Sequence, residues 1–571
     1  MGPAFDKPLD VGTGVVCASF GADGSWLSIG RLHPRWGFVE LNGLPPFAES
    51  DRGDPAATRR YRGLMTSPRH AWLRVEPGVR SVGASGQPGA PWVTQRLEVG
   101  QGTGHVVRVT GRLDRPALAE ITEVNPPAPT GARTEFHVEG GRLTIGSTAL
   151  SATATVDVSE GRWKHTEGGA ELVLKGGGSR TIHIAVALES ALGAPSTPAP
   201  PWALPEDVPG GLEGIVERAL TYVRSCTALV CAPGERAILT DHRILPLSWT
   251  RDAYFQALLL LASGTPADVA IVGDHLRWLW RRCERPEGRW MRSHHGNGRP
   301  KDLAFQADQQ LYPFVELADY WNATGQLPDG LEWDRMVPEA WRVVLAALDP
   351  DTGLIATEEN AADDRIEAPF TAGSQVLLWY AATRLAQAGL PAALGLEQDG
   401  LLSTAARVRS AFERHIVNGG RWSYAVDGRG RTVDYHDANE FPTALAPIWG
   451  FCSRDDPRWL ATMRYAFSSA NPAMVAGPDG GLGSRHTPGV WPLGLIQAWL
   501  VSRIRGDAAA ATSALRRLED AAFRDGMLPE ALVDDGTATI PVRHWFAWPG
   551  AALGALWLLD RDGRLEMLGT R

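Results

Sequence analysis

The stretch APSTPAPPWALPEDVPG, residues 194–210, separates two parts of the chain that have different sequence patterns. Its six prolines in 17 positions exclude a regular helix or a central strand, because proline lacks the backbone N–H and fixes its own φ angle. We therefore predict a proline-rich linker over residues 196–210. It would join an N-terminal domain, residues 1–195, to a larger domain, residues 211–571.

The residues before the linker have the pattern of short β-strands. Runs such as His105–Gly111 (HVVRVTG) and Thr181–Val186 are rich in β-branched residues. Turn dipeptides such as Asp23-Gly24 and Gly140-Gly141 follow at short intervals. Regular short strands with glycine-rich turns are typical of an antiparallel β-sandwich, which we predict for residues 1–195.

Beyond the linker the hydrophobic period becomes that of amphipathic helices, and we expect no strands there. Thr265-Pro266 and Asp456-Pro457 place a capping residue before a first-turn proline. Twelve helices joined as hairpins predict an (α/α)6 six-hairpin barrel with six inner and six outer helices. The expected segments are 211–229, 249–263, 266–284, 302–323, 336–348, 370–388, 399–416, 439–451, 457–470, 491–505, 508–524 and 545–559.

Every second helix of this series, beginning with 249–263, follows a loop rich in charged residues, histidine and tryptophan. If these are the inner helices, their six preceding loops open at one end of the barrel. A ring of functional loops on a rigid scaffold is a typical arrangement for an active site.

The composition narrows the function class. The chain has 571 residues, of which 44% are hydrophobic and 21% charged, so wholesale disorder is excluded. A net charge of −9 disfavours a nucleic-acid partner, and no apolar run is long enough to predict a membrane span. We expect a cytoplasmic protein and leave the oligomeric state open, a homo-oligomer included. The 22 tryptophans, against 9 tyrosines, hint at sugar stacking.

The five cysteines are scattered, and no pair has the C-x-x-C spacing of a zinc site. We expect buried free thiols, no metal and no cofactor.

Two acidic segments are candidates for acid/base chemistry. Residues 357–367 (TEENAADDRIE) hold five carboxylates, and Glu530 precedes the last helix. In a closed ring of hairpins these segments would face each other across the central pocket. A glycosidase needs one carboxylic acid that protonates the leaving oxygen and a second carboxylate that activates water. Clustering and burial would raise the pKa of one such carboxyl group.

From about residue 245 to 560 the chain resembles two related families of α/α-barrel glycoside hydrolases. HDANEFPTALAPIWGFCSRDDPRW (436–459), GGLGSRHTPGVWPLGLI (480–496) and RHWFAWPGAALG (543–554) resemble the C-terminal blocks of metal-independent exo-α-1,6-mannosidases. WTRDA, PFTAGSQVLLWYA, LPEA and the opening VCASFGADGSWLSIG are similar to segments of glucoamylase-like inverting α-glucosidases and trehalases.

Both resemblances imply an inverting enzyme without a catalytic metal, in which Glu530 is the general base. The mannosidase resemblance implies that the acid is in the Asp363-Asp364 pair, with Asp364 preferred. The glucoamylase resemblance implies Glu358 or Glu359 instead. The substrate would be a small oligosaccharide or glycoside that loses a terminal α-linked hexose, mannose or glucose.

A further set of residues would line the pocket and hold one sugar. These are Trp249, Arg251, Asp252, Asp308, Asp437, Asn439, His486, Trp491, Arg543, Trp545 and Trp548. Of the tryptophans, four stand at the starts of predicted inner helices, around the pocket mouth: Trp249, Trp491, Trp545 and Trp548.

The chain departs from the mannosidase pattern at three places. Gln306 stands where that family usually has an acidic residue, Pro529 where it has a histidine, and SHHGNGRP (293–300) replaces its Asn- and Phe-containing loop. These departures concern the sugar specificity more than the hydrolytic chemistry. Two other classes stay open: an α/α-barrel lyase, isomerase or terpenoid-processing enzyme acting on a non-sugar substrate, and a non-catalytic carbohydrate-binding protein.

Overall fold

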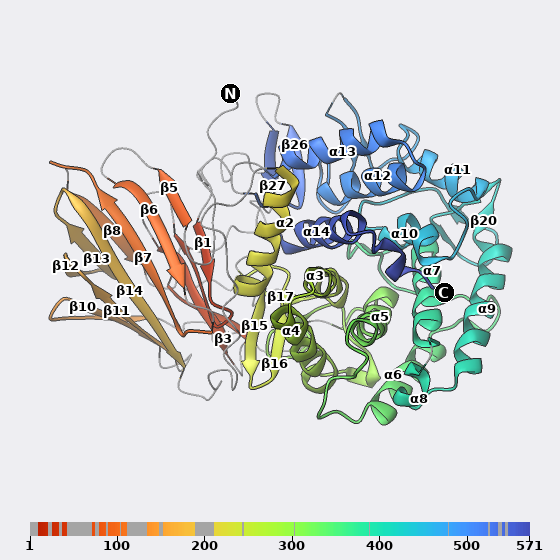
Figure 1. Cartoon of the computed structure of the whole chain (residues 1–571), viewed down its shortest axis with the longest axis horizontal. Helices are drawn as coiled ribbons and strands as arrows, with labels where there is room; N and C mark the ends of the chain where they lie inside the picture. Colours follow the sequence, from red (N-terminus) through yellow and green to blue (C-terminus); the bar gives the residue numbers. More distant parts are fainter. Residues whose placement is uncertain are drawn as a thin grey trace.

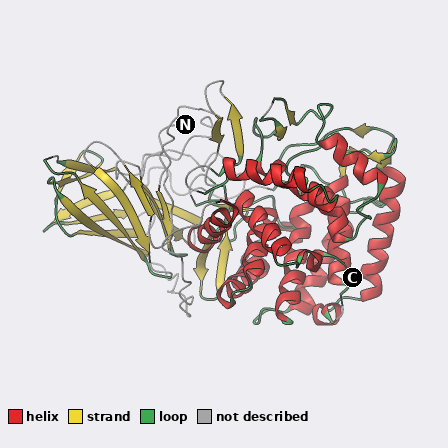
Figure 2. Cartoon of the chain, turned by 45° about the horizontal axis from the view of Figure 1, so that its top comes forward, coloured by secondary structure: helices red, strands yellow, loops and turns green. Residues whose placement is uncertain are grey.

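A computed structural model gives the arrangement of the chain. It describes residues 9–20, 26–33, 37–42, 71–74, 79–86, 89–102, 104–110, 134–147, 152–188, 211–242, 245–301, 303–387, 389–477, 479–522, 526–534, 539–542 and 546–570. Antiparallel sheets lie on one side of the molecule and helices on the other (Figures 1 and 2). The predicted linker, residues 196–210, lies outside the described residues, so the domain division stays a prediction.

The N-terminal strands form three antiparallel sheets, with the orders β1-β2-β3-β4, β5-β6-β7-β14-β11-β10-β9 and β12-β13-β8. The strands are β1 (Leu9–Gly12), β2 (Val16–Phe20), β3 (Trp26–His33), β4 (Gly37–Asn42), β5 (Ala71–Arg74), β6 (Val79–Gly86), β7 (Trp92–Val99), β8 (His105–Thr110), β9 (Glu135–Glu139), β10 (Arg142–Ser147), β11 (Ala152–Val158), β12 (Arg162–Thr166), β13 (Gly169–Leu174) and β14 (Gly178–Leu188).

The three sheets share one apolar core. Trp26 of β3, Leu97 of β7, Leu143 of β10 and Leu172 of β13 belong to the same cluster of buried side chains. Buried and less buried residues alternate along β7, as the period of two in a strand requires. The ring of Trp26 also contacts Trp163 edge to face, with 6.0 Å between centroids, which joins the first sheet to the third.

Each of the twelve predicted helical segments contains a helix. The inner helices are α3 (Thr250–Ser263), α5 (Ala307–Thr324), α7 (Ala372–Leu385), α10 (Phe441–Trp449), α12 (Pro492–Ile504) and α14 (Ala547–Arg561). The outer helices are α2 (Gly211–Tyr222), α4 (Pro266–Arg277), α6 (Trp333–Ala346), α9 (Gln398–His415), α11 (Pro457–Ala466) and α13 (Ala508–Ala521).

The inner helices pack on one another in sequence, and α14 closes the ring by packing on α3. Their sequences are largely apolar all round, as in α3, where every residue from Thr250 to Ala262 is buried. The outer helices, such as α6, bury one face only. The ring brings the segments before the inner helices together at one end, which is where the candidate site lies.

The expectation that no strands occur in this part was wrong. β15 (Ala228–Ala232) and β16 (Glu235–Ile238) form a hairpin, because a turn with Gly234 at a positive φ follows the buried run ALVCA. A short apolar run cannot be told from a helix end by its period alone. The other short strands are β17 (Leu247–Ser248), β18 (His294–His295), β19 (Phe370–Thr371), β20 (Val417–Asn418), β21 (Arg421–Trp422), β22 (Ala425–Val426), β23 (Thr432–Val433), β24 (Met474–Val475), β25 (Gly481–Leu482), β26 (Ala531–Asp534) and β27 (Thr539–Val542).

Several short helical turns complete the fold. They are α8 (Leu390–Leu394), η3 (Val223–Thr227), η4 (Trp278–Arg282), η5 (Pro286–Gly288) and η6 (Leu565–Leu568). The π-helical turns η3 and η4 extend α2 and α4, which is why those two segments looked longer in the sequence. All five cysteines are buried free thiols, as predicted. Among the helices that the structure describes, none combines the length and the apolar character needed to cross a bilayer.

Candidate active site

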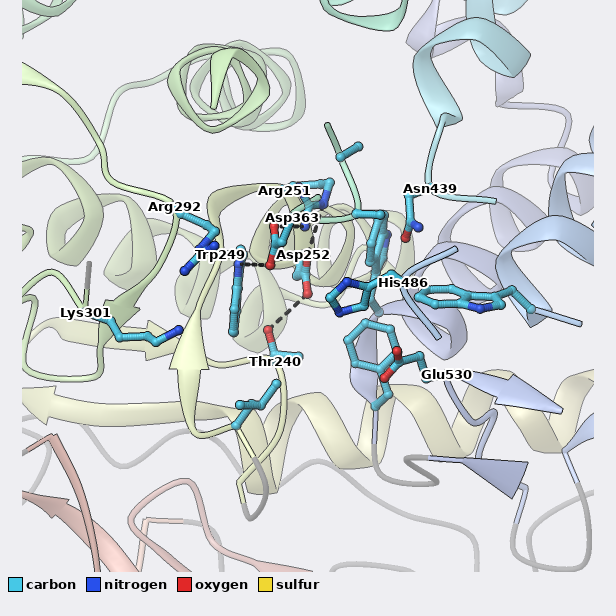
Figure 3. Close-up of a pocket in the computed structure, with 16 residues that line it drawn as sticks. Thr240, Trp249, Arg251, Asp252, Arg292, Lys301, Asp363, Asn439, His486 and Glu530 are labelled. Atoms are coloured by element: carbon cyan, nitrogen blue, oxygen red, sulfur yellow. Dashed lines mark hydrogen bonds and ion pairs between the residues drawn. The ribbon is translucent and has the colours of Figure 1, made fainter. Parts of the chain in front are cut away.

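A cavity of about 730 Å³, counting its opening to solvent, lies at the end of the ring where the inner helices begin (Figure 3). Nine of the residues expected at the site line it: Trp249, Arg251, Asp252, Asp363, Asn439, His486, Trp491, Glu530 and Trp548. Its other lining residues are Thr240, Leu245, Arg292, Lys301, Ala361, Ala362 and Phe546.

Arg251, in the first turn of α3, is surrounded by three carboxylates. Its Nη1 donates to Oδ2 of Asp308 over 2.9 Å, its Nε lies 3.3 Å from Oδ1 of Asp252, and its Nη2 lies 3.5 Å from Oδ1 of Asp363. Burial alone would lower the pKa of the guanidinium, but the three aspartates outweigh it and raise that pKa. The cation also lies 5.0 Å from the ring centroid of Trp548, a cation–π distance. The guanidinium of Arg251 is therefore a fixed positive charge among three aspartates of the site.

Asp252 is a buried carboxyl group with an unusual affinity for protons. Its Oδ2 accepts a hydrogen bond of 3.0 Å from the hydroxyl of Thr240, and its Oδ1 has no hydrogen-bond partner among the described residues. Burial raises the pKa of Asp252 to about 7, helped by the negative charge of Asp363 and opposed by Arg251. The cavity thus contains a carboxyl group that titrates near neutral pH, with one oxygen that accepts no hydrogen bond from these residues.

Asp363 lies against the cavity on the loop before α7, with a left-handed φ of 64°. Its Oδ1 accepts from Nε2 of Gln306 over 2.7 Å, and its Oδ2 accepts from the indole N–H of Trp249 over 3.0 Å. Burial would raise the pKa of Asp363, but Arg251 and then Arg292 outweigh it and lower that pKa. A positive φ is uncommon outside glycine, and such positions cluster at functional sites.

The neighbouring acidic residues do not line the cavity. They include Asp364, which the sequence favours as the acid. The Asp364 side chain is 37% exposed and lies 3.2 Å from Nδ1 of His486, outside the cavity lining. Glu359 is held by Arg292 and Gln306, at 3.1 Å and 3.0 Å, and the exposed Glu358 accepts from the backbone N–H of Phe305. The left-handed backbone at Asp363 turns that side chain, and not its neighbour, toward the cavity.

Glu530 reaches the same cavity from the segment before β26, far from Asp363 in the chain (Figure 3). Its side chain is fully buried, and its Oε1 accepts a hydrogen bond of 2.6 Å from the hydroxyl of Thr487. Its backbone N–H donates to the carbonyl of Val542, which ties it to the β26–β27 hairpin. The two carboxylates predicted to meet across the ring therefore line one cavity.

Asp308 and Asp437 are buried behind the cavity and do not line it. Asp308 holds Arg251, as described above. Asp437 accepts from the hydroxyls of Tyr435 and Ser484 and from the amide of Asn439, which itself lines the cavity. Both aspartates thus act through a neighbour. Arg543 and Trp545 lie outside the described residues.

The sequence missed several residues of the site. Thr240, the hydroxyl donor to Asp252, carries no periodic or motif signal. Thr487, the donor to Glu530, lies inside the block GGLGSRHTPGVWPLGLI (480–496), which was the available signal. Arg292 and Lys301 flank SHHGNGRP, the segment that departs from the mannosidase pattern, so that departure was the available signal. In the part of the chain that the structure describes, no group of three or more His, Cys, Asp or Glu side chains could hold a metal ion.

Residues 345–558 match the model of a protein family described as metal-independent alpha-mannosidase (GH125). Meiotically up-regulated gene 157 protein of Schizosaccharomyces pombe is 31% identical over 170 residues, which are 29% of this chain. That match spans only 30% of the length of the yeast protein.

Two solved structures are similar to this fold. One is a Streptococcus pneumoniae protein from a family of metal-independent alpha mannosidases, in complex with alpha-1,6-mannobiose. It covers 61% of this chain and 94% of its own, with 21% identity and a TM-score of 0.51. The other is a bacterial glucoamylase in complex with acarbose, which covers 99% of this chain and 96% of its own, with 11% identity and a TM-score of 0.63. The match over residues 345–558 identifies that segment as a domain of the metal-independent alpha-mannosidase family, a family of glycoside hydrolases.

Proposed function

We propose that this protein is an exo-acting, inverting α-glycoside hydrolase that removes a terminal α-linked hexose from a small oligosaccharide or glycoside. The observation that carries the proposal is that Asp363 and Glu530, from distant segments, line one cavity together with Arg251 and Asp252. The family match favours mannose over glucose as the hexose. In architecture, the proposal includes a complete (α/α)6 barrel of six hairpins behind an N-terminal β-sandwich.

In this proposal Glu530 is the general base and Asp363 is the general acid. Asp363 is preferred to Asp364 because only Asp363 lies against the cavity. An acid must carry a proton, whereas Arg251 lowers the pKa of Asp363 and so favours its anion. Asp252 and Asp363 both contact Arg251, so their protonation is coupled, and Asp252 retains a proton up to about pH 7. We propose that the proton retained by Asp252 passes to Asp363 when substrate binds, and that Asp363 delivers it to the leaving oxygen and is left as the anion.

The remaining lining residues suit one sugar ring. Asp252 presents a buried oxygen, Oδ1, that can form a hydrogen bond with a sugar hydroxyl. Asn439 and His486 add donors and acceptors on the side of Glu530 (Figure 3). Trp249, Trp491 and Trp548 supply apolar ring faces, which pack against the C–H faces of pyranose rings.

The test is a panel of chromogenic α-mannosides and α-glucosides assayed with the parent, Asp363→Asn and Glu530→Gln. Loss of a general acid or base costs about 10²–10⁴ in rate. We expect losses of that size for both variants. Asp364→Asn is the matched control, because it makes the same change one residue away but outside the cavity, and it should keep most of the activity.

Two outcomes would overturn the assignment. Wild-type rates for both Asp363→Asn and Glu530→Gln on a true substrate would show that these two residues are not the general acid and the general base. Tight binding of a mannoside without any turnover would instead favour a carbohydrate-binding protein.

A further inference from the structure

A buried chain of polar groups connects the first β-sheet to the wall of the cavity. Ser19 of β2 donates from its hydroxyl to Oδ1 of Asp10 on β1 over 2.5 Å. The same hydroxyl lies 3.2 Å from Nε2 of His242, and Nδ1 of His242 lies 2.9 Å from the hydroxyl of Tyr222, at the end of α2. All four side chains are at most 5% exposed, so this network is sealed from solvent.

One set of proton positions satisfies the three hydrogen bonds named above. The Tyr222 hydroxyl donates to Nδ1 of His242, the Nε2–H of His242 donates to Ser19, and the Ser19 hydroxyl donates to Asp10. The residue types are those of a Ser-His-Asp triad, but here Asp10 accepts from the serine, and none of these residues lines the cavity. The arrangement therefore suits a structural connection and not a nucleophile.

His242 belongs to the segment that forms one wall of the active site. Thr240 and Leu245, on either side of it, both line the cavity, and Thr240 donates to Oδ2 of Asp252. A hydrogen bond within the segment joins Leu245 to Asp241, because the backbone N–H of Leu245 donates to the carboxylate of Asp241. The backbone carbonyl of Thr240 also accepts from the N–H of Ala547, at the start of α14.

The first sheet is itself fixed against the helical part of the molecule by backbone bonds. Gly14, in the turn between β1 and β2, donates from its N–H to the carbonyl of Ser225 over 2.8 Å and accepts from the N–H of Val230 over 2.8 Å. Both partners lie close to α2, in η3 and β15. The sheet is thus a fixed support against which residues 239–242 can be held.

We propose that Asp10, Ser19 and His242 are positioning residues of the active site, and that the N-terminal sheet holds Thr240 at its hydrogen bond to Asp252. This inference rests on the proposed function for its kinetic consequence only. The local stability around Thr240 and His242 can be measured without any substrate.

Loss of this support has a defined effect on the chemistry. The groups around Asp252 are Arg251, Asp363, Asp308 and Thr240, and the Thr240 hydroxyl is a neutral donor that favours the ionised form. If Thr240 moves away, Asp252 holds its proton to higher pH. The alkaline limb of kcat/KM, which reports the free enzyme, should then move to higher pH.

The experiment uses the full chain with Ser19→Ala, which removes the hydroxyl between Asp10 and His242. Asp10→Asn is a second variant that keeps the shape of the side chain. Ser147→Ala is the matched control, because Ser147 is a buried serine on β10 of the seven-stranded N-terminal sheet, and its hydroxyl has no hydrogen-bond partner among the described residues. Amide hydrogen exchange over residues 239–249 and pH profiles of kcat/KM are measured for all four proteins.

A buried hydrogen bond of about 1.4 kcal/mol corresponds to about a tenfold change in an opening equilibrium. We therefore expect exchange about tenfold faster over residues 239–249 in Ser19→Ala, a similar loss in kcat/KM, and an alkaline limb at higher pH. Ser147→Ala should match the parent. Exchange in Ser19→Ala and Asp10→Asn equal to that in Ser147→Ala would overturn the inference. Absence of any glycosidase activity in the parent would overturn the proposed function but leave the exchange result decisive for the positioning role.

Discussion

Substitution of Asp252 by asparagine tests the electrostatics of the cavity without needing a substrate. Burial raises the pKa of this carboxyl from an ordinary 3.8 to about 7. The native state therefore binds more protons than the unfolded state between these pH values, and the free energy of unfolding falls as the pH rises. Below about pH 4 both states are protonated, and this contribution disappears.

The size of the effect follows from the shift. A difference of about 3 pKa units corresponds to about 4 kcal/mol, which Asp252 costs the native state above pH 7. An asparagine side chain cannot ionise, so the Asp252→Asn variant should gain stability over the parent as the pH rises from 4 to 8. For a cooperative unit of about 360 residues, 4 kcal/mol is about 5 °C in the melting temperature.

The assay is a series of thermal melts of the parent and the variant from pH 4 to pH 8. Asp427→Asn is a control of opposite sign. Asp427 accepts from the backbone N–H groups of Arg429 and Arg431, which lower its pKa. The melting temperature of the parent should therefore rise relative to that of the Asp427→Asn variant as the pH rises. A melting difference for Asp252→Asn that does not change with pH, or that falls as the pH rises, would refute the reasoning.

Three further predictions concern the groups around the carboxylates. Thr487→Val removes the hydroxyl that donates to Glu530, so kcat/KM should fall about tenfold, whereas Thr487→Ser should retain activity. Equal values of kcat/KM for the two variants would contradict this role of Thr487. Gln306→Glu restores the charge that the mannosidase family usually has there and raises the pKa of Asp363, so the alkaline limb of kcat/KM should move to higher pH; an unchanged or lower limb would contradict it. Arg384→Leu leaves the buried Asp319 without its ion-pair partner, which costs about 3–5 kcal/mol of unfolding free energy. The melting temperature should therefore fall by several degrees. An unchanged melting temperature would show that the pair contributes nothing to stability.

The helices could be predicted because their signals are local. Capping pairs such as Asp456-Pro457 mark where helices begin, and the accepting Asp456 side chain is seen at that position. The β15–β16 hairpin could not be separated from the preceding helix, because ALVCA is apolar throughout and gives no period. The sequence thus predicts which helices exist, but it does not predict the exact course of the chain between them.

The candidate site was predictable only as a set of segments. Periodicity and ring closure brought the loops of Asp363 and Glu530 to one end of the barrel. They could not decide between Asp363 and Asp364, because the direction of each side chain depends on a left-handed backbone angle at one residue. Contacts such as that of Ser19 with His242 join residues 223 positions apart and leave no trace in local sequence.

The most direct test of the proposed mechanism is the configuration of the sugar that is released first. Proton NMR of an α-mannoside during hydrolysis distinguishes the two anomers before they equilibrate. If Asp363 protonates the leaving oxygen on one face of the sugar ring and Glu530 activates a water molecule on the opposite face, the first product is β-mannose. If α-mannose appears first, a carboxylate attacks the sugar directly, and the assignment of Glu530 as the general base is wrong.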